Sequence, residues 1–326
     1  MRNHINFIGQ IYGGFIMKKQ EYRPEGIIDP SDSVYLSGIK GLSRALAEDR
    51  ILQAKCLMCD ANHNLHLKIG GIKAIIPREE TALGIKEGMV KDVAIITRVN
   101  KMVCFKVMKI SQNEGDTVVY LSRRAAQQEC ENYIFENYLV GDIIDARITH
   151  MEQFGAFADI GCGVVSMISI DNISVSRIAH PKNRFYIGMD VKAVVKSIDY
   201  SNLRINLSHK ELLGTWLENA SMFNAGETVT GIVRSIESYG VFIELTPNLA
   251  GLAEVTQGVE VGNKVSVYIK SIIPQKMKIK LSIVDVTDSA SDIDEISYMY
   301  NDNKIEVWKY SPPDCVKCIE TAFVLK

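Results

Sequence analysis

Hydrophobic and polar residues alternate in many short runs along this chain, which is the pattern of strands with one buried face. In the run KMKIKLS (276–282) every second residue is a lysine, while Met277, Ile279 and Leu281 fall on the opposite side. Similar runs, rich in β-branched residues and separated by Gly, Pro and Asn turns, fill most of residues 50–283. The pattern predicts a mainly β protein.

The arrangement of residues is repeated. The segment FGAF (154–157) returns as YGVF (239–242), 85 positions later. The segments around Gly188 and at LRINLS (203–208) return 74 positions later, so the second copy lacks 11 residues of the stretch around SRIAHPKNRF. Three matches in one order, with a single deletion between them, indicate duplicated modules.

A weaker copy lies upstream. LHLKIGGIKAIIPREE (65–80), KEGMVKDVAII (86–96) and VVYLS (118–122) fill the same slots, with Gly88 in the place of Gly188. In this alignment His63 and His66 stand where the later copies have their rings. The first module is therefore predicted to keep the frame without the rings.

Each module reads as five short strands, and a small antiparallel unit of five strands removes its edges by closing into a barrel, as the OB-fold does. Helical segments join the modules, at 122–139 and from Ser208, where Ser208 and Glu211 have capping-box spacing. Trp216 in the second helix is predicted to pack against a barrel. The predicted organisation is an N-terminal extension (1–49), modules at 50–124, 140–212 and 225–283, and an acidic extension (284–326) with an apolar piece that docks on a barrel.

The composition and the net charge say less about function than the repeat does. The 326 residues are 47% hydrophobic with a formal charge of −2, as in globular proteins. Residues 50–124 hold 13 Lys and Arg against 7 Asp and Glu, and residues 284–326 hold 4 against 9. A basic module beside an acidic tail can hide affinity for a polyanion behind a neutral total.

No apolar run is long enough to span a membrane, so no membrane partner is expected. The opening MRNHINFIGQIYGGFIMKKQ lacks the small-residue cleavage site of a signal peptide, and Met17 is an alternative start. The expected location is cytoplasmic.

The seven cysteines do not form the pattern of a disulfide framework. Cys56 and Cys59, with Cys315 and Cys318, could in principle supply four thiolates to zinc. The favoured interpretation is that they are small buried hydrophobes, because i,i+3 positions on a strand face opposite sides. No metal and no cofactor is expected.

GDIIDARITHMEQFGAFADIGCGVVSMISIDNIS (141–174), with GMDVKAVVKSIDYSNLRINLSHKE (188–211), resembles the S1 RNA-binding domain, a family named after bacterial ribosomal protein S1. The resemblance covers nearly all of 140–212, covers 225–283 well and covers 50–124 loosely. The insert HPKNRF and the segments PEG and IIPREE also resemble short ribosomal S1-like proteins of clostridial-type bacteria.

The resemblance implies an OB-fold barrel that binds single-stranded RNA on one face, through two strand-two aromatics, a strand-three histidine and a strand-five base. The residues that match are the aromatics Phe154, Phe157, Tyr239 and Phe242, and the bases Arg204 and Lys278. The histidine does not carry over, because Ser169 and Glu254 stand in its slots, and Val118 replaces the base in the first module.

Four further residues of the middle module are candidate RNA contacts, with a merely solvated role as the favoured alternative. They are Arg147 and His150, on the strand that leads to Phe154, and Lys182 and Arg184, in the insert.

The orientation of the rings depends on the strand. On an unbroken strand Phe154 and Phe157 would point to opposite faces, and one of them would be core. A bulge at Gly155 would bring both outside, where bases could stack on them.

Three functions compete. The first is non-catalytic binding of single-stranded RNA in translation, with the small ribosomal subunit as a candidate partner. The second is a protein-interaction role with residual RNA affinity, which the lost histidines and the equal charges of residues 140–212 (8 basic, 8 acidic) favour. The third, an enzyme, is disfavoured because no phosphate-binding glycine loop, HExxH or spaced carboxylate cluster occurs.

Overall fold

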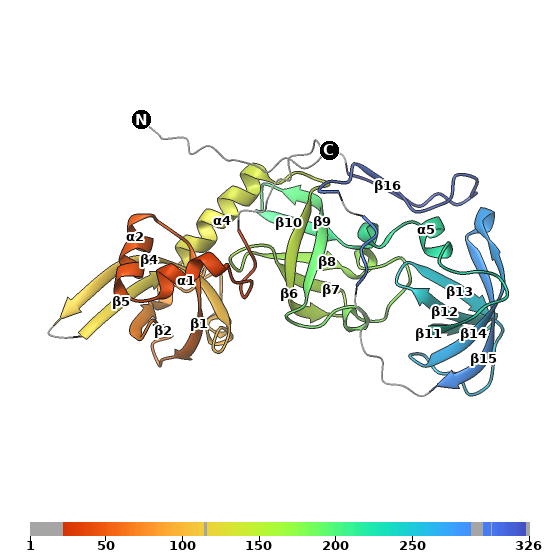
Figure 1. Cartoon of the computed structure of the whole chain (residues 1–326), viewed down its shortest axis with the longest axis horizontal. Coiled ribbons are helices and arrows are strands. Elements are labelled where there is room, and N and C mark those ends of the chain that lie inside the picture. The colour runs from red at the N-terminus through yellow and green to blue at the C-terminus, as the bar shows by residue number, and fades with distance from the viewer. Residues whose placement is uncertain (1–21, 114–115, 288–295, 301, 324–326) are drawn as a thin grey trace.

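Three closed β-barrels follow one another along the longest axis of the molecule (Figure 1). The structure is a computed structural model and describes residues 22–113, 116–287, 296–300 and 302–323. Helix α4 runs from the first barrel to the middle one, and the segment that carries β16 lies over the middle and last barrels.

Each barrel has five strands. The first contains β1 Leu52–Cys59, β2 Leu65–Ile69, β3 Ile72–Ile76, β4 Met102–Asn113 and β5 Asp116–Ser122. The middle one contains β6 Ile143–Glu152, β7 Gly155–Asp159, β8 Val165–Ser169, β9 Asp190–Asp199 and β10 Arg204–Ser208. The last contains β11 Thr228–Glu237, β12 Gly240–Thr246, β13 Leu249–Ala253, β14 Lys264–Ile273 and β15 Lys278–Thr287.

All three barrels share one strand order. The first, second, third, fifth and fourth strands follow one another around the barrel, and the fourth closes on the first. Only the third and fifth strands pair in parallel. This five-stranded arrangement confirms the predicted tandem OB-fold.

Alternation places the side chains as predicted over most of the last strand. Ile279 and Leu281 are buried in the core, whereas Lys278 and Lys280 are exposed. Met277 does not continue the strand: it lies in the preceding turn with φ of +46°. Strand β15 therefore begins at Lys278, and its first buried residue is Ile279.

The match of residues 86–96 to the segment around Gly188 is wrong. This segment forms a loop and the short helix α3 Val93–Ile96, and the fourth strand of the barrel begins only at Met102. The KEGMV motif imitates the sequence around Gly188 without occupying its place in the fold.

Asn100, rather than Gly88, takes the position of Gly188 and Gly262. Their φ angles are +65°, +90° and +99°, and each N–H donates to a carbonyl of its barrel's first strand at 2.7–2.9 Å. Asparagine is one of the few residues that tolerate a left-handed backbone. The glycine at position 88 therefore does not mark the turn that precedes the fourth strand.

Helices connect the barrels. The α-helices are α1 Ser33–Leu36, α2 Ile39–Ala47, α3, α4 Arg123–Asn137 and α5 Trp216–Ala220. The 3₁₀ turns are η1 Pro30–Asp32, η2 Arg78–Glu80, η3 Ile170–Asn172, η4 Pro181–Asn183, η5 Lys210–Leu213 and η6 Pro274–Lys276.

The predicted helix at 122–139 is confirmed, and Ser122 caps it by accepting a hydrogen bond from Ala125 N–H at 2.8 Å. The helix predicted from Ser208 is broken in two. Gly214, with φ of +82°, separates η5 from α5, and Thr215 opens α5 with a capping box of its own. Trp216 is buried, as predicted.

The C-terminal segment docks on the barrels, as its apolar residues predicted. Strands β16 Val307–Lys309 and β17 Glu320–Ala322 form a hairpin. Trp308, Tyr310 and Phe323 are buried in the same cluster as the core of the last barrel. No helix among the described residues is long and apolar enough to cross a membrane.

Candidate nucleic-acid interface

Two pairs of aromatic rings stand on the outside of the middle and last barrels. Phe154 is 57% exposed, Phe157 is half-buried, and their ring centroids are 6.0 Å apart at 90°. Tyr239 is 68% exposed, Phe242 is half-buried, and their centroids are 6.1 Å apart at 90°. The same edge-to-face pair is thus built twice, and neither phenylalanine of the middle barrel belongs to the core.

The rings reach the surface without a bulge at Gly155, so that prediction is wrong. Phe154 lies in the turn before β7, and the strand begins only at Gly155. The strand rule that would separate the two rings therefore does not apply. Gly155 serves close packing instead, because a Cβ there would lie 2.5 Å from the carbonyl oxygen of Ile168.

The bulge lies on the neighbouring strand. In the middle barrel the pairing of β6 with β7 shifts between Ile148 and His150. In the last barrel the pairing of β11 with β12 shifts between Val233 and Ser235. His150 is thereby paired with Phe157, and their rings stack at 6.0 Å and 29°. The middle barrel presents three rings where the last presents two.

Strand pairing extends each ring pair into a row across the barrel. In the middle barrel the row is His150, Phe157, Met167, Asn206 and Ser197. In the last barrel the row is Ser235, Phe242, Leu252, Lys280 and Ser271. Lys280 thus lies in line with Phe242, a placement that sequence reasoning did not exploit.

The first barrel has the same row with different residues: Met58, His66, Ile75, Tyr120 and Lys109. His66 occupies the ring position, as the alignment predicted, and its Nε2 lies 2.9 Å from a carboxylate oxygen of Asp60. Hydrogen bonds from His66 and the backbone of the turn lower the pKa of Asp60. Tyr120 is an aromatic member that the comparison of ring slots alone does not reveal.

The strand-five bases are exposed. Arg204 opens β10 and Lys278 opens β15, each two residues before the member of its row. Alternation on a strand puts residues two apart on the same face. Both cations therefore lie on the ring-bearing side of their barrels.

In each of these two barrels a bulged lysine reaches toward the slot that lacks the expected histidine. Lys270 Nζ lies 3.2 Å from a carboxylate oxygen of Glu254. Lys196 Nζ donates to Asn172 Oδ1 at 2.9 Å, and the Asn172 amide in turn donates to Ser169 Oγ at 2.7 Å. Partial burial, with the nearby charge of Lys210, lowers the pKa of Lys196.

Both lysines lie where the pairing of the fourth strand with the fifth skips a residue. A bulge leaves one residue unpaired, so its side chain is free to lean along the sheet. Alternation of polar and apolar residues does not mark such positions, which is why sequence reasoning missed them.

The S1 RNA binding domain family matches residues 138–210 of this chain. The chain therefore contains an S1 RNA binding domain. The match coincides with β6 through β10, the strands of the barrel that carries the three rings.

About half of the chain is similar to curated ribosomal proteins. The chain is 34% identical over 182 residues to small ribosomal subunit protein bS1 of Staphylococcus aureus (strain COL), covering 51% of this chain and 46% of that protein. It is 29% identical over 180 residues to the bS1 homolog of Bacillus subtilis (strain 168), covering 54% and 46%. The chain thus spans about half the length of the curated relatives it matches.

Two solved structures resemble this chain with low TM-scores. One is a multidomain protein with nucleic acid binding domains from Streptococcus pneumoniae, 12% identical, covering 76% of this chain and 77% of that chain with a TM-score of 0.25. The other is GSP13 from Bacillus subtilis, 19% identical, covering 22% and 55% with a TM-score of 0.21.

Not every candidate contact of the S1 domain joins the rings. Arg147 is held by Asp190 at 2.6 and 2.8 Å and also donates to the carbonyl oxygen of Glu25 at 3.3 Å. Lys182 is exposed on η4. Only His150 of the four additional candidates makes a ring contact with the aromatic pair.

Arg184 is not a surface residue, so its expected solvated or RNA-contacting role is wrong. It is buried at the junction of the middle and last barrels and donates to the carboxylate of Glu244. Arg234 donates to the same carboxylate at 2.9 Å through two nitrogens. A partner 60 positions away removes this arginine from the surface, and the local sequence gives no sign of it.

The cysteines form no metal centre among the described residues. Cys56 is buried and Cys59 is half-buried, and burial raises the pKa of both thiols. Cys318 is exposed on the C-terminal hairpin, so the prediction of buried cysteines fails there.

Proposed function

We propose that this chain binds single-stranded RNA on the ring-bearing faces of its middle and last barrels, without catalysing a reaction. The observation that carries the proposal is the repeated edge-to-face pair, Phe154 with Phe157 and Tyr239 with Phe242, at nearly identical separation. Unstacked bases regain stacking on such rings at roughly 1–3 kcal/mol per base. Every base has a π-face, so the platform accepts many sequences.

The cations beside the rings fit the phosphate backbone. Arg204, Lys278 and Lys280 are exposed on the fifth strands of their barrels, β10 and β15. Neutralising phosphates in this way makes affinity fall as salt rises. A duplex keeps its bases paired, so it is expected to compete poorly with a single strand.

The biological setting that we propose is translation at the small ribosomal subunit, in the cytoplasm. Support comes from the S1 domain at 138–210 and from the similarity to bS1 proteins over about half their length. Messenger RNA is the single strand that this setting provides.

A protein-docking role is a second candidate for the first barrel alone. Its ring slot holds His66, and Leu57, Met58 and Met108 are each about half exposed around the same row. Exposed apolar side chains in one region suit a protein partner better than a phosphate backbone.

The proposal is tested by titrating a labelled single-stranded 12-mer RNA with wild-type protein and with Phe154→Ala/Phe157→Ala, at several salt concentrations. We expect wild-type dissociation constants on the order of micromolar that rise with salt. The double variant is expected to bind at least about tenfold more weakly, since each stacked base contributes roughly 1–3 kcal/mol.

Tyr186→Ala is the matched control, because Tyr186 is an exposed aromatic of the same barrel outside the row. It is expected to bind like wild type. Undetectable binding at low salt, or equal binding by all three proteins, would overturn the proposal in favour of a protein partner.

A further inference from the structure

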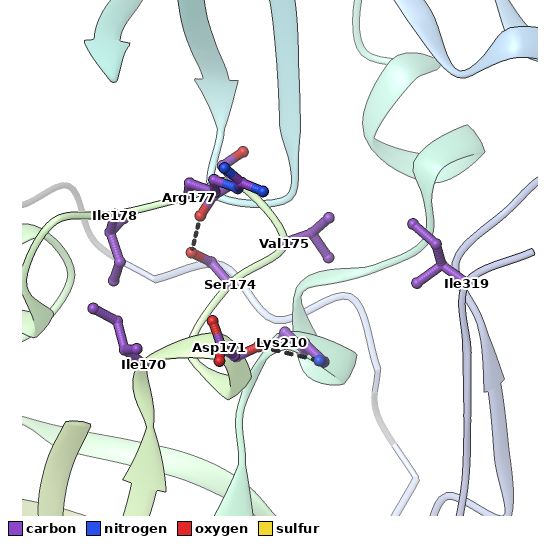
Figure 2. Close-up of a pocket in the computed structure, with 9 residues that line it drawn as sticks. Ile170, Asp171, Ser174, Val175, Arg177, Ile178, Lys210 and Ile319 are labelled. Carbon is purple, nitrogen blue, oxygen red and sulfur yellow. Dashed lines mark hydrogen bonds between the residues drawn. The ribbon is translucent and has the colours of Figure 1, made fainter. Parts of the chain in front are cut away.

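A cavity of about 400 Å³ lies beside the middle barrel, between its insert and the C-terminal hairpin (Figure 2). Its lining comes from the loop after β8, from the start of η5 and from the residue just before β17. The lining residues are Ile170, Asp171, Ser174, Val175, Ser176, Arg177, Ile178, Lys210 and Ile319.

One edge of this cavity is hydrogen-bonded to the backbone of the turn that carries Phe154. The N–H of Ile170, a lining residue, donates to the carbonyl oxygen of Phe154 at 2.9 Å. Asp171 follows directly, and its carbonyl oxygen accepts a hydrogen bond from Lys210 Nζ at 3.1 Å, as Figure 2 shows. The turn that carries the Phe154 ring is therefore hydrogen-bonded to the edge of the cavity.

Among the charged groups of the lining, cations outnumber anions. Arg177 is exposed and makes no ion pair or hydrogen bond through its side chain with any residue that the structure describes. Lys210 uses one ammonium N–H on a neutral carbonyl and keeps two. One carboxylate, that of Asp171, also belongs to the lining and forms no ion pair with any residue that the structure describes. The lining therefore carries two cations against one anion.

The residues belong to a feature that the last barrel lacks. The insert between β8 and β9 is what makes the middle module 11 residues longer than the last one over the matched segments. It is also fixed in place: Val175 N–H donates to Asn248 Oδ1 at 3.0 Å, and Ser176 N–H donates to the carbonyl oxygen of Pro247 at 3.2 Å. A guanidinium and an ammonium carried on a backbone fixed in this way are groups that recognise phosphate.

We propose that this cavity is a phosphodiester subsite, in which Arg177 and Lys210 hold the backbone of single-stranded RNA that extends beyond the Phe154 and Phe157 rings. The inference rests on the proposed function, because it assigns the next segment of the same RNA. A long RNA, which reaches the cavity, should therefore bind more tightly than a short RNA that contacts only the rings. Its affinity should also depend more strongly on salt.

The test compares a 4-mer with a 12-mer RNA of uniform sequence. Wild type, Arg177→Ala/Lys210→Ala, Phe154→Ala/Phe157→Ala and Lys309→Ala/Lys317→Ala are titrated at several salt concentrations. The last variant is the matched control, because it also removes two positive charges, from exposed positions on the C-terminal hairpin. Thermal unfolding midpoints establish that each variant is folded.

Arg177→Ala/Lys210→Ala is expected to weaken the 12-mer about tenfold and to reduce its salt slope by roughly 1.4, at about 0.7 for each lost phosphate contact on a single strand. The 4-mer affinity should not change. The charge-keeping variant Arg177→Lys/Lys210→Arg is expected to recover most of the 12-mer affinity, whereas the ring variant should weaken both RNAs.

Equal 12-mer binding by wild type and Arg177→Ala/Lys210→Ala, with both still sensitive to the ring variant, would overturn the subsite and leave the proposed function intact. If wild type binds neither RNA detectably at low salt, the proposed function itself is overturned. Inorganic phosphate is titrated in parallel: if it raises the unfolding midpoint of wild type only, while the 12-mer affinities stay equal, the cavity takes free anions and not RNA.

Discussion

Arg123 holds Glu25 in a two-pronged ion pair, with Nε at 2.6 Å and Nη2 at 2.9 Å from the two carboxylate oxygens, and both side chains are buried. The Glu25 carboxylate also accepts a hydrogen bond from Cys104 N–H of the first barrel at 2.9 Å. Its own N–H donates to Asp159 of the middle barrel at 2.7 Å. One residue of the N-terminal extension thus joins the first barrel, α4 and the middle barrel.

Replacing Glu25 by Gln should loosen this junction. Removing one partner of a buried ion pair leaves the other charge uncompensated, at a cost of roughly 3–5 kcal/mol. We expect a lower urea midpoint for Glu25→Gln and faster proteolysis between the first two barrels. Asp116→Asn is the control, because the Lys73–Asp116 pair is exposed and should contribute nothing measurable. Equal urea midpoints for Glu25→Gln and wild type would contradict the role of Glu25.

A neutral residue, Asn248, plays the corresponding part between the middle and last barrels. It is fully buried; its Oδ1 accepts from Val175 N–H at 3.0 Å, and its Nδ2 donates to the carbonyls of Lys210 and Gly214 at 2.8 and 2.9 Å. Its own carbonyl oxygen accepts from the hydroxyl of Tyr310 at 2.5 Å. The insert, η5, the last barrel and the C-terminal hairpin therefore meet at one side chain.

Asn248→Ala should lower the free energy of unfolding by roughly 2–3 kcal/mol, because polar groups at the junction are left without partners. The measurement is urea denaturation followed by tryptophan fluorescence, since Trp216 and Trp308 both lie in the cluster at this junction. Asn132→Ala, on the exposed face of α4, is the control and should unfold like wild type. Coincident curves for Asn248→Ala and the control would show that the junction does not depend on this amide.

The barrels could be predicted from the sequence because alternation alone fixes which residues of a strand are buried. Ile279 and Leu281 illustrate this, as they enter the core while the lysines between them stay outside. The start of the fourth strand of the first barrel could not be predicted, because the turn before it needs only a left-handed backbone. Asn100 supplies that with no glycine.

The rings of the candidate site and its strand-five bases, Arg204 and Lys278, were predictable from the sequence, whereas its other charges were not. Phe154 and Tyr239 stand in the predicted positions, although a turn rather than a bulge brings them out. Arg184 looks like a surface cation in the sequence, and only the fold brings Glu244 to it. Lys196 and Lys270 depend on where a strand bulges, which the alternation does not record.

Glu254→Gln should strengthen RNA binding by the last barrel. Glu254 stands in the slot of the expected histidine, and its carboxylate lies 3.2 Å from Lys270 Nζ, whose charge it neutralises. Releasing that lysine adds a phosphate contact, so the salt slope should steepen by about 0.7 and affinity should rise several-fold.

Glu260→Gln is the control for overall charge, because Glu260 is an exposed acid of the same barrel and forms no ion pair among the described residues. Both variants are titrated with the same 12-mer RNA. If the two gain affinity equally, the effect belongs to net charge and not to the Lys270–Glu254 pair.

Acid should weaken the junction of the middle and last barrels through His209. Its ring is buried between Phe185 and Tyr298, and its Nδ1 donates to the carbonyl oxygen of Ile173 at 2.9 Å. Burial lowers the pKa of His209 from 6.5 to about 4. The unfolded chain therefore takes up a proton below about pH 6.5 that the folded chain refuses until about pH 4.

The contribution of His209 to stability is complete above pH 6.5 and is lost as the pH falls through this window, by roughly 3 kcal/mol for a shift of this size. His209→Asn keeps a donor for the Ile173 carbonyl and cannot be protonated. We expect it to be less stable than wild type at pH 7, because it fills less of the site, but to lose less stability between pH 7 and pH 4.5. Urea denaturation across this range measures both, and parallel pH profiles for the two proteins would rule His209 out as the origin of the acid sensitivity.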